Sequence, residues 1–238
     1  MKAMVLAAGF GVRLRPLTLT TPKVLVPVEG RPLISYPLRL LARFGFKEVI
    51  INLHHLGEKI ESSLEDGKAF GIRIRYSREK SLLGTGGGIR QASPLFQGEP
   101  VLVLNGDILI DLNLEDFIRF HETQKGIATM ALRSLEIPSP FTPLTMNAEN
   151  HILQIGTYAA QDNFMYTGVQ ILEPPFYERL PLRESCLIQE GYKPVLQSGG
   201  RVYGYPYDGY WNDVGTLDRL KEVDSNLKSG KIALKYQS

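Results

Sequence analysis

The chain has 238 residues, and 43% of them are hydrophobic, an ordinary composition for a globular protein with a sizeable core. Lys and Arg number 27 against 25 Asp and Glu, and this balance gives no sign of a nucleic-acid or membrane partner. One cysteine, Cys186, excludes a disulfide framework and a thiolate metal cage. The apolar run at the start is too short for a secretory signal, and no window approaches membrane-spanning length, so the sequence predicts a cytoplasmic protein.

Strands and helices alternate in the first half of the chain. Continuous apolar runs predict buried strands over 1–8, 47–53 and 101–107, and residues 72–76 alternate as a further strand. Helical spacing of apolar residues predicts helices over 33–44 and 57–64, and Asn113 is placed to cap a helix that runs through Gln124. This order indicates an α/β fold with an open, mostly parallel sheet, which binds ligands beyond the carboxyl ends of its strands.

The second half has a looser pattern. Strands are predicted over 127–133, 151–155, 164–172 and 201–207, a proline-rich loop over 137–143 and a last helix over 216–227. No change of composition marks a linker and no repeat occurs, so we expect one domain whose distal half adds a small antiparallel layer.

The loop after the first strand, LAAGFGVRLRPLTLTTPK over 6–23, fits neither of the common phosphate-binding motifs. A dinucleotide fingerprint would place its third glycine where Leu14 stands, and no helix follows directly. A P-loop would continue as Gly-Lys-Ser/Thr into a helix, whereas Arg15-Pro16 interrupts the chain. Both motifs are therefore excluded.

What remains is a long loop that prolines stiffen. Gly9 and Gly11 free its backbone to approach a ligand, while Arg13, Arg15 and Lys23 supply positive charge. The plainer alternative is a glycine turn whose arginines are solvated surface charges.

Two acids strengthen the ligand-binding interpretation. Asp107 stands where the buried strand VLVLN ends, and Asp213 in WNDVGT precedes a turn and a helix. Mg²⁺ binds carboxylate oxygens, typically one or two from the protein together with substrate phosphates. Each acid alone could be a turn or helix-end residue. Since each follows a predicted strand, we expect both at one edge of the parallel sheet, sharing a metal ion.

Several other residues have plain interpretations. Adjacent His54 and His55 would point opposite ways at a strand end, so a zinc site there is not expected. His121 is expected on a helix surface. The tyrosines of 203–210 and Trp211 could stack on a sugar ring, but aromatic residues in a strand more often serve packing.

The segments LAAGFGVRLRPLTLTTPKVLVPV, LGTGGGI (83–89), LNGD and WNDVGT resemble, in this order, those of the sugar-1-phosphate nucleotidylyltransferases. The resemblance spans residues 1–228 and is closest to a short, uridylyl-transferring group that shares the TGGGI segment. Mannose-1-phosphate guanylyltransferases and glucose-1-phosphate thymidylyltransferases are relatives. The implied fold is a Rossmann-like, glycosyltransferase-A-type three-layer α/β sandwich with a mixed, mostly parallel sheet. The implied domain is one catalytic domain over 1–238, with nucleotide binding by 1–126 and sugar binding by 127–238.

The resemblance also implies roles for individual residues. Arg13, Lys23 and Asp107 would be catalytic, Asp107 and Asp213 would hold Mg²⁺, and Thr167 with Gly168 would form a turn that contacts the sugar. The nucleotide would lie against Leu6, Ala8, Gly9, Gly11, Val12, Arg13, Lys23, Gly86 and Asn105. The Glu-Lys-Pro segment that many relatives carry before the sugar region is missing here, which leaves the identity of the sugar open.

The implied reaction is attack of a sugar 1-phosphate on the α-phosphorus of a nucleoside triphosphate, with release of pyrophosphate. A phosphate monoester has its second pKa near ~6, so the nucleophile is mostly dianionic at neutral pH and no general base is needed. Arg13, Lys23 and Mg²⁺ would neutralise the two polyanions.

Glycine backbone in LGTGGGI could pair with the edge of a pyrimidine, so UTP is the expected nucleotide. The alternatives are a mannose-1-phosphate guanylyltransferase, a cytidylyltransferase acting on a phosphorylated alcohol such as phosphocholine, and a catalytically inactive nucleotide-sensing subunit. The protein could be a monomer or a homo-oligomer.

Overall fold

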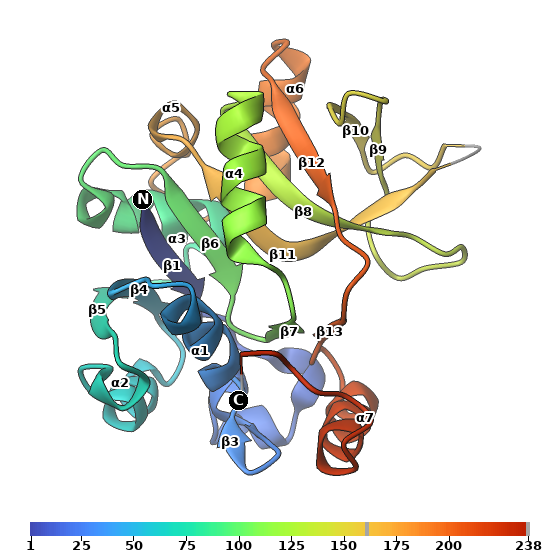
Figure 1. Ribbon diagram of the computed structural model, residues 1–238. Coiled ribbons are helices and arrows are strands. Elements are labelled where there is room, and N and C mark those ends of the chain that lie inside the picture. The colour runs from blue at the N-terminus through green and yellow to red at the C-terminus, as the bar shows by residue number, and fades with distance from the viewer. Residues whose placement is uncertain (160–161, 237–238) are drawn as a thin grey trace. The chain divides into compact units, whose positions relative to one another are not determined.

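The computed structural model describes residues 1–159 and 162–236 (Figure 1). The chain forms two compact units that interleave along the sequence. The N-terminal unit comprises Lys2–Leu82, Leu104–Asp111 and Gly209–Ser238, and the middle unit comprises Met1, Leu83–Val103 and Leu112–Asp208. The expected assignment of nucleotide binding to residues 1–126 and of sugar binding to residues 127–238 stays a prediction.

The N-terminal unit is built on parallel strands β1 (Lys2–Leu6), β4 (Glu48–Leu53) and β5 (Arg73–Arg78), with Ala3 opposite Val49 and Val49 opposite Ile74. The end of β6 (Val101–Asn105) follows β1 on the other side. Strands β1 and β4 and the end of β6 are largely buried because their apolar side chains point to both faces of the sheet, whereas the edge strand β5 buries only Ile74 and Ser77. Parallel pairing aligns their carboxyl ends at one edge, where the loops to α1 (Ser35–Arg43) and α2 (Gly57–Leu64) begin.

Short elements complete this unit. Three 3₁₀ helices, Val12–Leu14, Leu17–Leu19 and Lys23–Leu25, follow β1, and a fourth covers Lys68–Phe70. Strands β2 (Pro27–Val28) and β3 (Arg31–Pro32) form a small hairpin. Strands β7 (Ile108–Ile110) and β13 (Trp211–Asp213) form a separate antiparallel pair, and α7 (Leu217–Lys228) follows β13.

The middle unit contains most of the antiparallel pairing. Strand β11 (Phe164–Leu172) pairs antiparallel with β8 (Ala128–Ser134) and β9 (Leu144–Met146), and β10 (Ile152–Ile155) pairs antiparallel with β9. The expected antiparallel layer is present, but β12 (Val202–Pro206) joins β8 in parallel. The helical elements of this unit are α3 (Gly84–Ala92), a 3₁₀ turn Ser93–Phe96, α4 (Leu114–Gln124), α5 (Pro174–Tyr177), a π-helix Leu187–Tyr192 and α6 (Lys193–Gln197).

Helix α4 lies along β8 and β12 and corrects one prediction (Figure 1). Its start is as predicted, because the Asn113 side chain accepts hydrogen bonds from the N–H groups of Glu115 and Asp116. His121, however, is buried and not on the surface, with only 3% exposed. It shares the inner helical face with Leu114 and Phe117, and its ring nitrogens lie 2.8 Å from Thr129 Oγ1 and 3.0 Å from Glu173 Oε1.

Candidate active site

The loop after β1 is folded around Gly11. This residue has φ 62°, and a Cβ there would lie 2.9 Å from both Lys23 Cβ and Thr18 Cγ2. Thr18 Oγ1 donates to the Gly11 carbonyl at 2.8 Å, so the turn is held from within the loop. Gly9 differs, because nothing lies within 4 Å of the position that its Cβ would take. The backbone at Gly9 therefore borders open space.

Buried polar side chains anchor the start of this loop. The Ala7 N–H donates to Asn52 Oδ1 at 2.9 Å, and Asn52 Nδ2 donates to Glu79 Oε1 at 2.7 Å. Asn52 and Glu79 are 2% and 5% exposed, so water competes little for these bonds. Asn52 belongs to β4 and Glu79 directly follows β5, and the network thus fixes the loop to the carboxyl ends of two parallel strands.

The other predicted residues of this region lie on the same unit. Ala8 is buried, Val12 begins the first 3₁₀ helix with an exposed side chain, and the Leu6 carbonyl accepts from the Gly106 N–H at 2.9 Å. Asn105 is the last residue of β6 and is partly exposed.

Lys23 and Asp107 form an ion pair, with side chains 12% and 26% exposed. Lys23 opens a 3₁₀ helix after Pro22, and Asp107 lies in the tight turn between β6 and β7. The residues predicted to carry phosphate charge and to hold metal are therefore in direct contact.

Asp107 and Asp213 come to the same place, Asp107 at the carboxyl end of β6 beside β1 as expected, and Asp213 through an antiparallel strand pair that was not expected. The antiparallel register of β7 and β13 sets Ile108 opposite Asp213, and the Val214 N–H donates to the Asp107 carbonyl at 2.9 Å. A two-stranded ladder, whose 3-residue strands are too short for a periodic signal, brings together acids that are far apart in sequence.

Asp213 has a cationic partner that the sequence analysis missed. Arg219, in the first turn of α7, pairs with Asp213. Gly215 leaves room for the Asp213 carboxylate and the Arg13 guanidinium, since a Cβ there would lie 2.9 Å from Asp213 Oδ2 and 3.2 Å from the Arg13 guanidinium. The available signal was a cation in the first turn of a predicted helix, where the positive end of the helix dipole disfavours it. Nearby, burial raises the pKa of Tyr210 to about 12, so its phenol stays neutral.

The donor set fits a divalent cation that also uses substrate oxygens. Two carboxylates are the typical protein contribution to such a Mg²⁺ site. Across residues 1–159 and 162–236 no cluster of three or more His, Cys, Asp or Glu side chains could hold a metal by itself. A metal at Asp107 and Asp213 would therefore need further ligands from phosphate or water.

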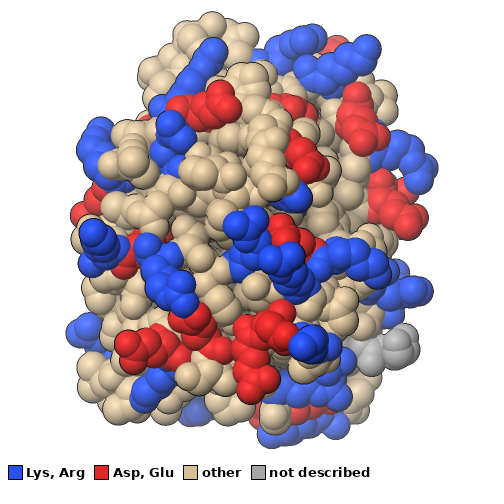
Figure 2. All heavy atoms as spheres, turned by 90° about the vertical axis from the view of Figure 1, so that its left-hand side faces the viewer, with Lys and Arg blue, Asp and Glu red and all other residues tan. Residues whose placement is uncertain are grey.

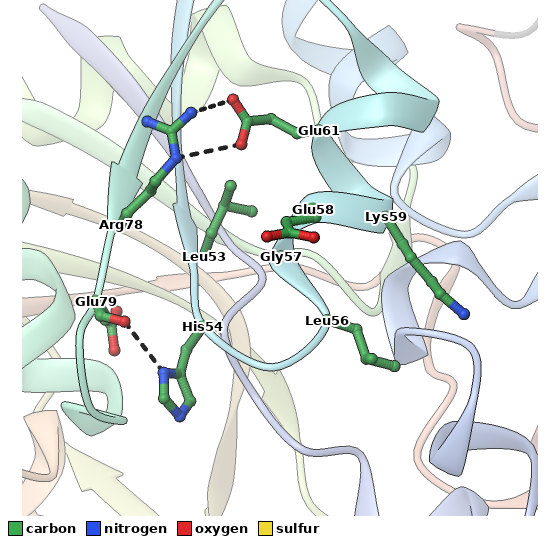
Figure 3. A pocket seen from close by; sticks show the side chains of 9 residues that line it. All are labelled: Leu53, His54, Leu56, Gly57, Glu58, Lys59, Glu61, Arg78 and Glu79. Atoms are coloured by element: carbon green, nitrogen blue, oxygen red, sulfur yellow. Dashed lines mark hydrogen bonds and ion pairs between the residues drawn. The ribbon is translucent and has the colours of Figure 1, made fainter.

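A pocket of about 440 Å³ opens at the carboxyl ends of β4 and β5, beside the start of α2 (Figure 3). Arg78 points across it to Glu61, donating from Nε to Oε2 at 3.2 Å. His54 Nδ1 lies 3.1 Å from the Glu79 carbonyl. The rings of His54 and His55 both contact Phe10, with centroids 5.8 and 5.1 Å away, and His55 Nε2 lies 3.2 Å from the Thr18 carbonyl.

The remaining predicted residues belong to the middle unit. Gly86 lies inside helix α3, where its N–H donates to the Ser185 carbonyl at 3.0 Å. A Cβ on Gly84 would lie 2.5 Å from the Ser185 carbonyl oxygen, and one on Gly87 2.1 Å from that of Arg183. The close packing of segment 183–185 against α3 therefore requires glycine at these positions, and no bound ligand is needed to explain them.

Thr167 and Gly168 do not form a turn, because both lie within strand β11. The β11–β8 register shifts between Tyr166 and Gln170, and Gly168 has φ 90°, as expected for a bulge. The Thr167 hydroxyl is buried and donates to the Ala131 carbonyl at 2.8 Å. Tyr205 packs against Phe117 and Phe120, which agrees with the plain interpretation of the aromatic strand.

Strand ends that carry a glycine loop, paired acids and basic side chains are typical of α/β proteins that bind phosphorylated ligands. The nucleotidyl transferase family model matches residues 2–230, and the chain belongs to this family. It is 39% identical to the N-acetylmuramate alpha-1-phosphate uridylyltransferase of Neisseria meningitidis serogroup B over 94% of this chain and 97% of the relative. It is 33% identical to the mannose-1-phosphate guanyltransferase beta-B of Xenopus laevis, covering 90% of this chain and 61% of that protein.

Solved structures give the fold independently. A Bacillus anthracis protein, assigned provisionally as a glucose-1-phosphate thymidylyltransferase, aligns with a TM-score of 0.84 at 21% identity and covers 100% of this chain and 99% of that chain. HddC from Yersinia pseudotuberculosis aligns with a TM-score of 0.81 at 21% identity over 95% and 99%. The predicted Rossmann-like α/β fold with a mixed sheet is confirmed. In the described part of the chain, every helix is too short or too polar to cross a membrane.

Proposed function

We propose that this nucleotidyltransferase moves a nucleoside monophosphate from a nucleoside triphosphate to a sugar 1-phosphate and releases pyrophosphate. The observation that carries the proposal is the contact of basic and acidic side chains, Lys23 with Asp107 and Arg219 with Asp213, beside a glycine loop that borders open space. The relatives named above, which transfer uridylyl or guanylyl groups, support the same class of reaction.

The residues of this chain act mainly by charge. Lys23 and Arg13 would bind triphosphate oxygens and stabilise the charge that builds up as the sugar phosphate approaches. The nucleophile is already a dianion near neutral pH, so no side chain has to remove a proton. The anchored backbone from Ala7 to Gly11 would hold the phosphates in place, since its turn is fixed before a ligand arrives.

Asp107 and Asp213 would hold Mg²⁺, which supplies charge neutralisation on the transferred phosphate. The hard carboxylate oxygens and the need for substrate oxygens favour Mg²⁺ over Zn²⁺, which prefers nitrogen and sulfur ligands.

UTP is the proposed nucleotide, with a hexose or amino-sugar 1-phosphate as acceptor. The relative that matches over nearly its whole length transfers a uridylyl group, whereas the guanylyltransferase is covered only to 61%. Gly86, Thr167 and Gly168 stay predicted ligand contacts, although the Gly86 N–H already has a backbone partner. A cytoplasmic location also stays a prediction.

Pyrophosphate release, measured with four nucleotides against a panel of phosphorylated acceptors, tests the proposal. The expected result is the highest kcat/KM with UTP and a sugar 1-phosphate. Preference for GTP with mannose 1-phosphate would support the guanylyltransferase alternative, and CTP with phosphocholine the cytidylyltransferase. Absence of release with every pair, from protein that binds nucleotide in titration calorimetry, would indicate a nucleotide-sensing subunit.

A further inference from the structure

Both carboxylates of the candidate metal site are already paired with a cation of this chain. Lys23 pairs with Asp107, and Arg219 pairs with Asp213. The four side chains are between 12% and 28% exposed, so solvent screens them only in part. A divalent ion that approached either acid would meet a neutralised carboxylate and a like charge.

The position of Arg219 at the start of α7 is unfavourable for the helix itself. The Arg219 N–H donates to the capping Thr216 Oγ1 at 3.3 Å, which places its guanidinium in the first turn of α7. A cation there interacts unfavourably with the positive end of the helix dipole. The ion pair with Asp213 offsets this unfavourable interaction and ties Arg219 to the candidate metal site.

We infer that Lys23 and Arg219 are resident counter-ions that mask Asp107 and Asp213, and that Arg219 is a positioning residue of the site. This inference rests on the proposed function. Metal binding requires both cations to leave their carboxylates, and the phosphates of an incoming nucleotide are the partners that can receive them. Metal and nucleotide therefore bind cooperatively, and metal alone binds weakly.

Mn²⁺ binding to nucleotide-free protein, followed by electron paramagnetic resonance, tests the inference without any turnover. Lys23→Met and Arg219→Met remove the masking charge and keep an unbranched side chain. Each is expected to tighten Mn²⁺ binding about tenfold, because removal of one like charge within a few ångströms is worth at least that factor. Arg219→Lys keeps the charge and is expected to bind Mn²⁺ as the unaltered protein does.

Arg78→Met is the matched control, since it breaks an ion pair with Glu61 in the same unit, at the end of edge strand β5 and not on β13 or in the turn after β6, which carry the two acids. It is expected to leave Mn²⁺ affinity unchanged. A tightening cannot come from misfolding, which would weaken binding. Unchanged or weaker binding in both Met variants would overturn the inference and leave the metal site standing. Absence of Mn²⁺ binding in every variant would overturn the metal site and the inference together.

Discussion

Two glycine segments that look alike in the sequence differ in the structure. In the loop after β1, Gly9 has nothing within 4 Å of its missing side chain. In α3, Gly84 and Gly87 have no room for one, because main-chain oxygens of Ser185 and Arg183 lie 2.5 and 2.1 Å away. Unfilled space beside a glycine indicates a place for a ligand, whereas filled space indicates packing. Counting glycines cannot separate the two.

The two segments also differ in charge. Basic and acidic side chains pair close to the first segment, where Lys23 and Arg13 each lie beside a glycine turn. Over the face of the molecule that Figure 2 shows, by contrast, blue and red side chains are interspersed, as on an ordinary protein surface. The local grouping at the loop therefore carries more information than the net charge of +2.

The largest expected effect tests the charged segment. Lys23→Ala should lower kcat at saturating substrates about 100-fold, comparable to the loss of one preorganised electrostatic contact. Steady-state kinetics with UTP and a sugar 1-phosphate measures it. A raised KM with unchanged kcat would reduce Lys23 to a binding residue.

The next effect tests the packed segment. In Gly87→Ala the new methyl group meets a backbone oxygen that cannot rotate away, which should cost about 2 kcal/mol after the gain in helix propensity of about 1 kcal/mol. This equals about a thirtyfold change in the folding equilibrium constant. Urea unfolding measures it.

Gly9→Ala is the matched substitution in the loop. The open space around it predicts a change in unfolding free energy within about 0.5 kcal/mol and a loss of UTP affinity. If Gly9→Ala unfolds as easily as Gly87→Ala, the distinction between ligand space and packing fails.

A third prediction concerns the paired acids. Asp107→Asn and Asp213→Asn should each raise the Mg²⁺ concentration for half-maximal rate about tenfold or more, since each replaces a charged metal ligand by a neutral one. Glu61→Asn, which also breaks an ion pair of the N-terminal unit, should leave the titration unchanged. An unaltered titration in Asp213→Asn would make Asp213 a partner of Arg219 only.

Much of the fold follows from periodicity in the sequence. Helix α2 over Gly57–Leu64 and strand β11 over Phe164–Leu172 have the predicted bounds. The β7–β13 pair was missed, since two strands of 3 residues leave no pattern and pair across a large gap in sequence. His121 was wrongly predicted on the surface because it is a polar residue, although it lies on the same buried helical face as Leu114 and Phe117.

Prediction of the site was uneven for a similar reason. Motifs pointed to the glycine loop and the acids as candidates, but not to their structural partners Asn52, Glu79 and Arg219. These residues act through three-dimensional contacts to other segments, with sequence separations of 45, 27 and 6 residues. Of these three residues, only Arg219 has a signal in the sequence, because a cation in the first turn of a predicted helix is disfavoured by the helix dipole.

The smallest effect compares helix caps in the two units. Asn113 accepts two N–H groups at the start of α4, at 3.0 and 3.3 Å, and Thr216 accepts one at the start of α7, at 3.3 Å. Replacement by Ala should cost about 1 kcal/mol at Asn113 and less at Thr216.

Thr216→Ala should nevertheless be the variant that alters the site, because this cap holds the backbone of Arg219. Looser placement of the guanidinium should unmask Asp213 and tighten Mn²⁺ binding, by less than Arg219→Met does. Asn113→Ala should leave Mn²⁺ affinity unchanged while lowering the urea midpoint more. If both substitutions lower stability and neither changes Mn²⁺ affinity, the cap of α7 has a structural role only and does not position Arg219.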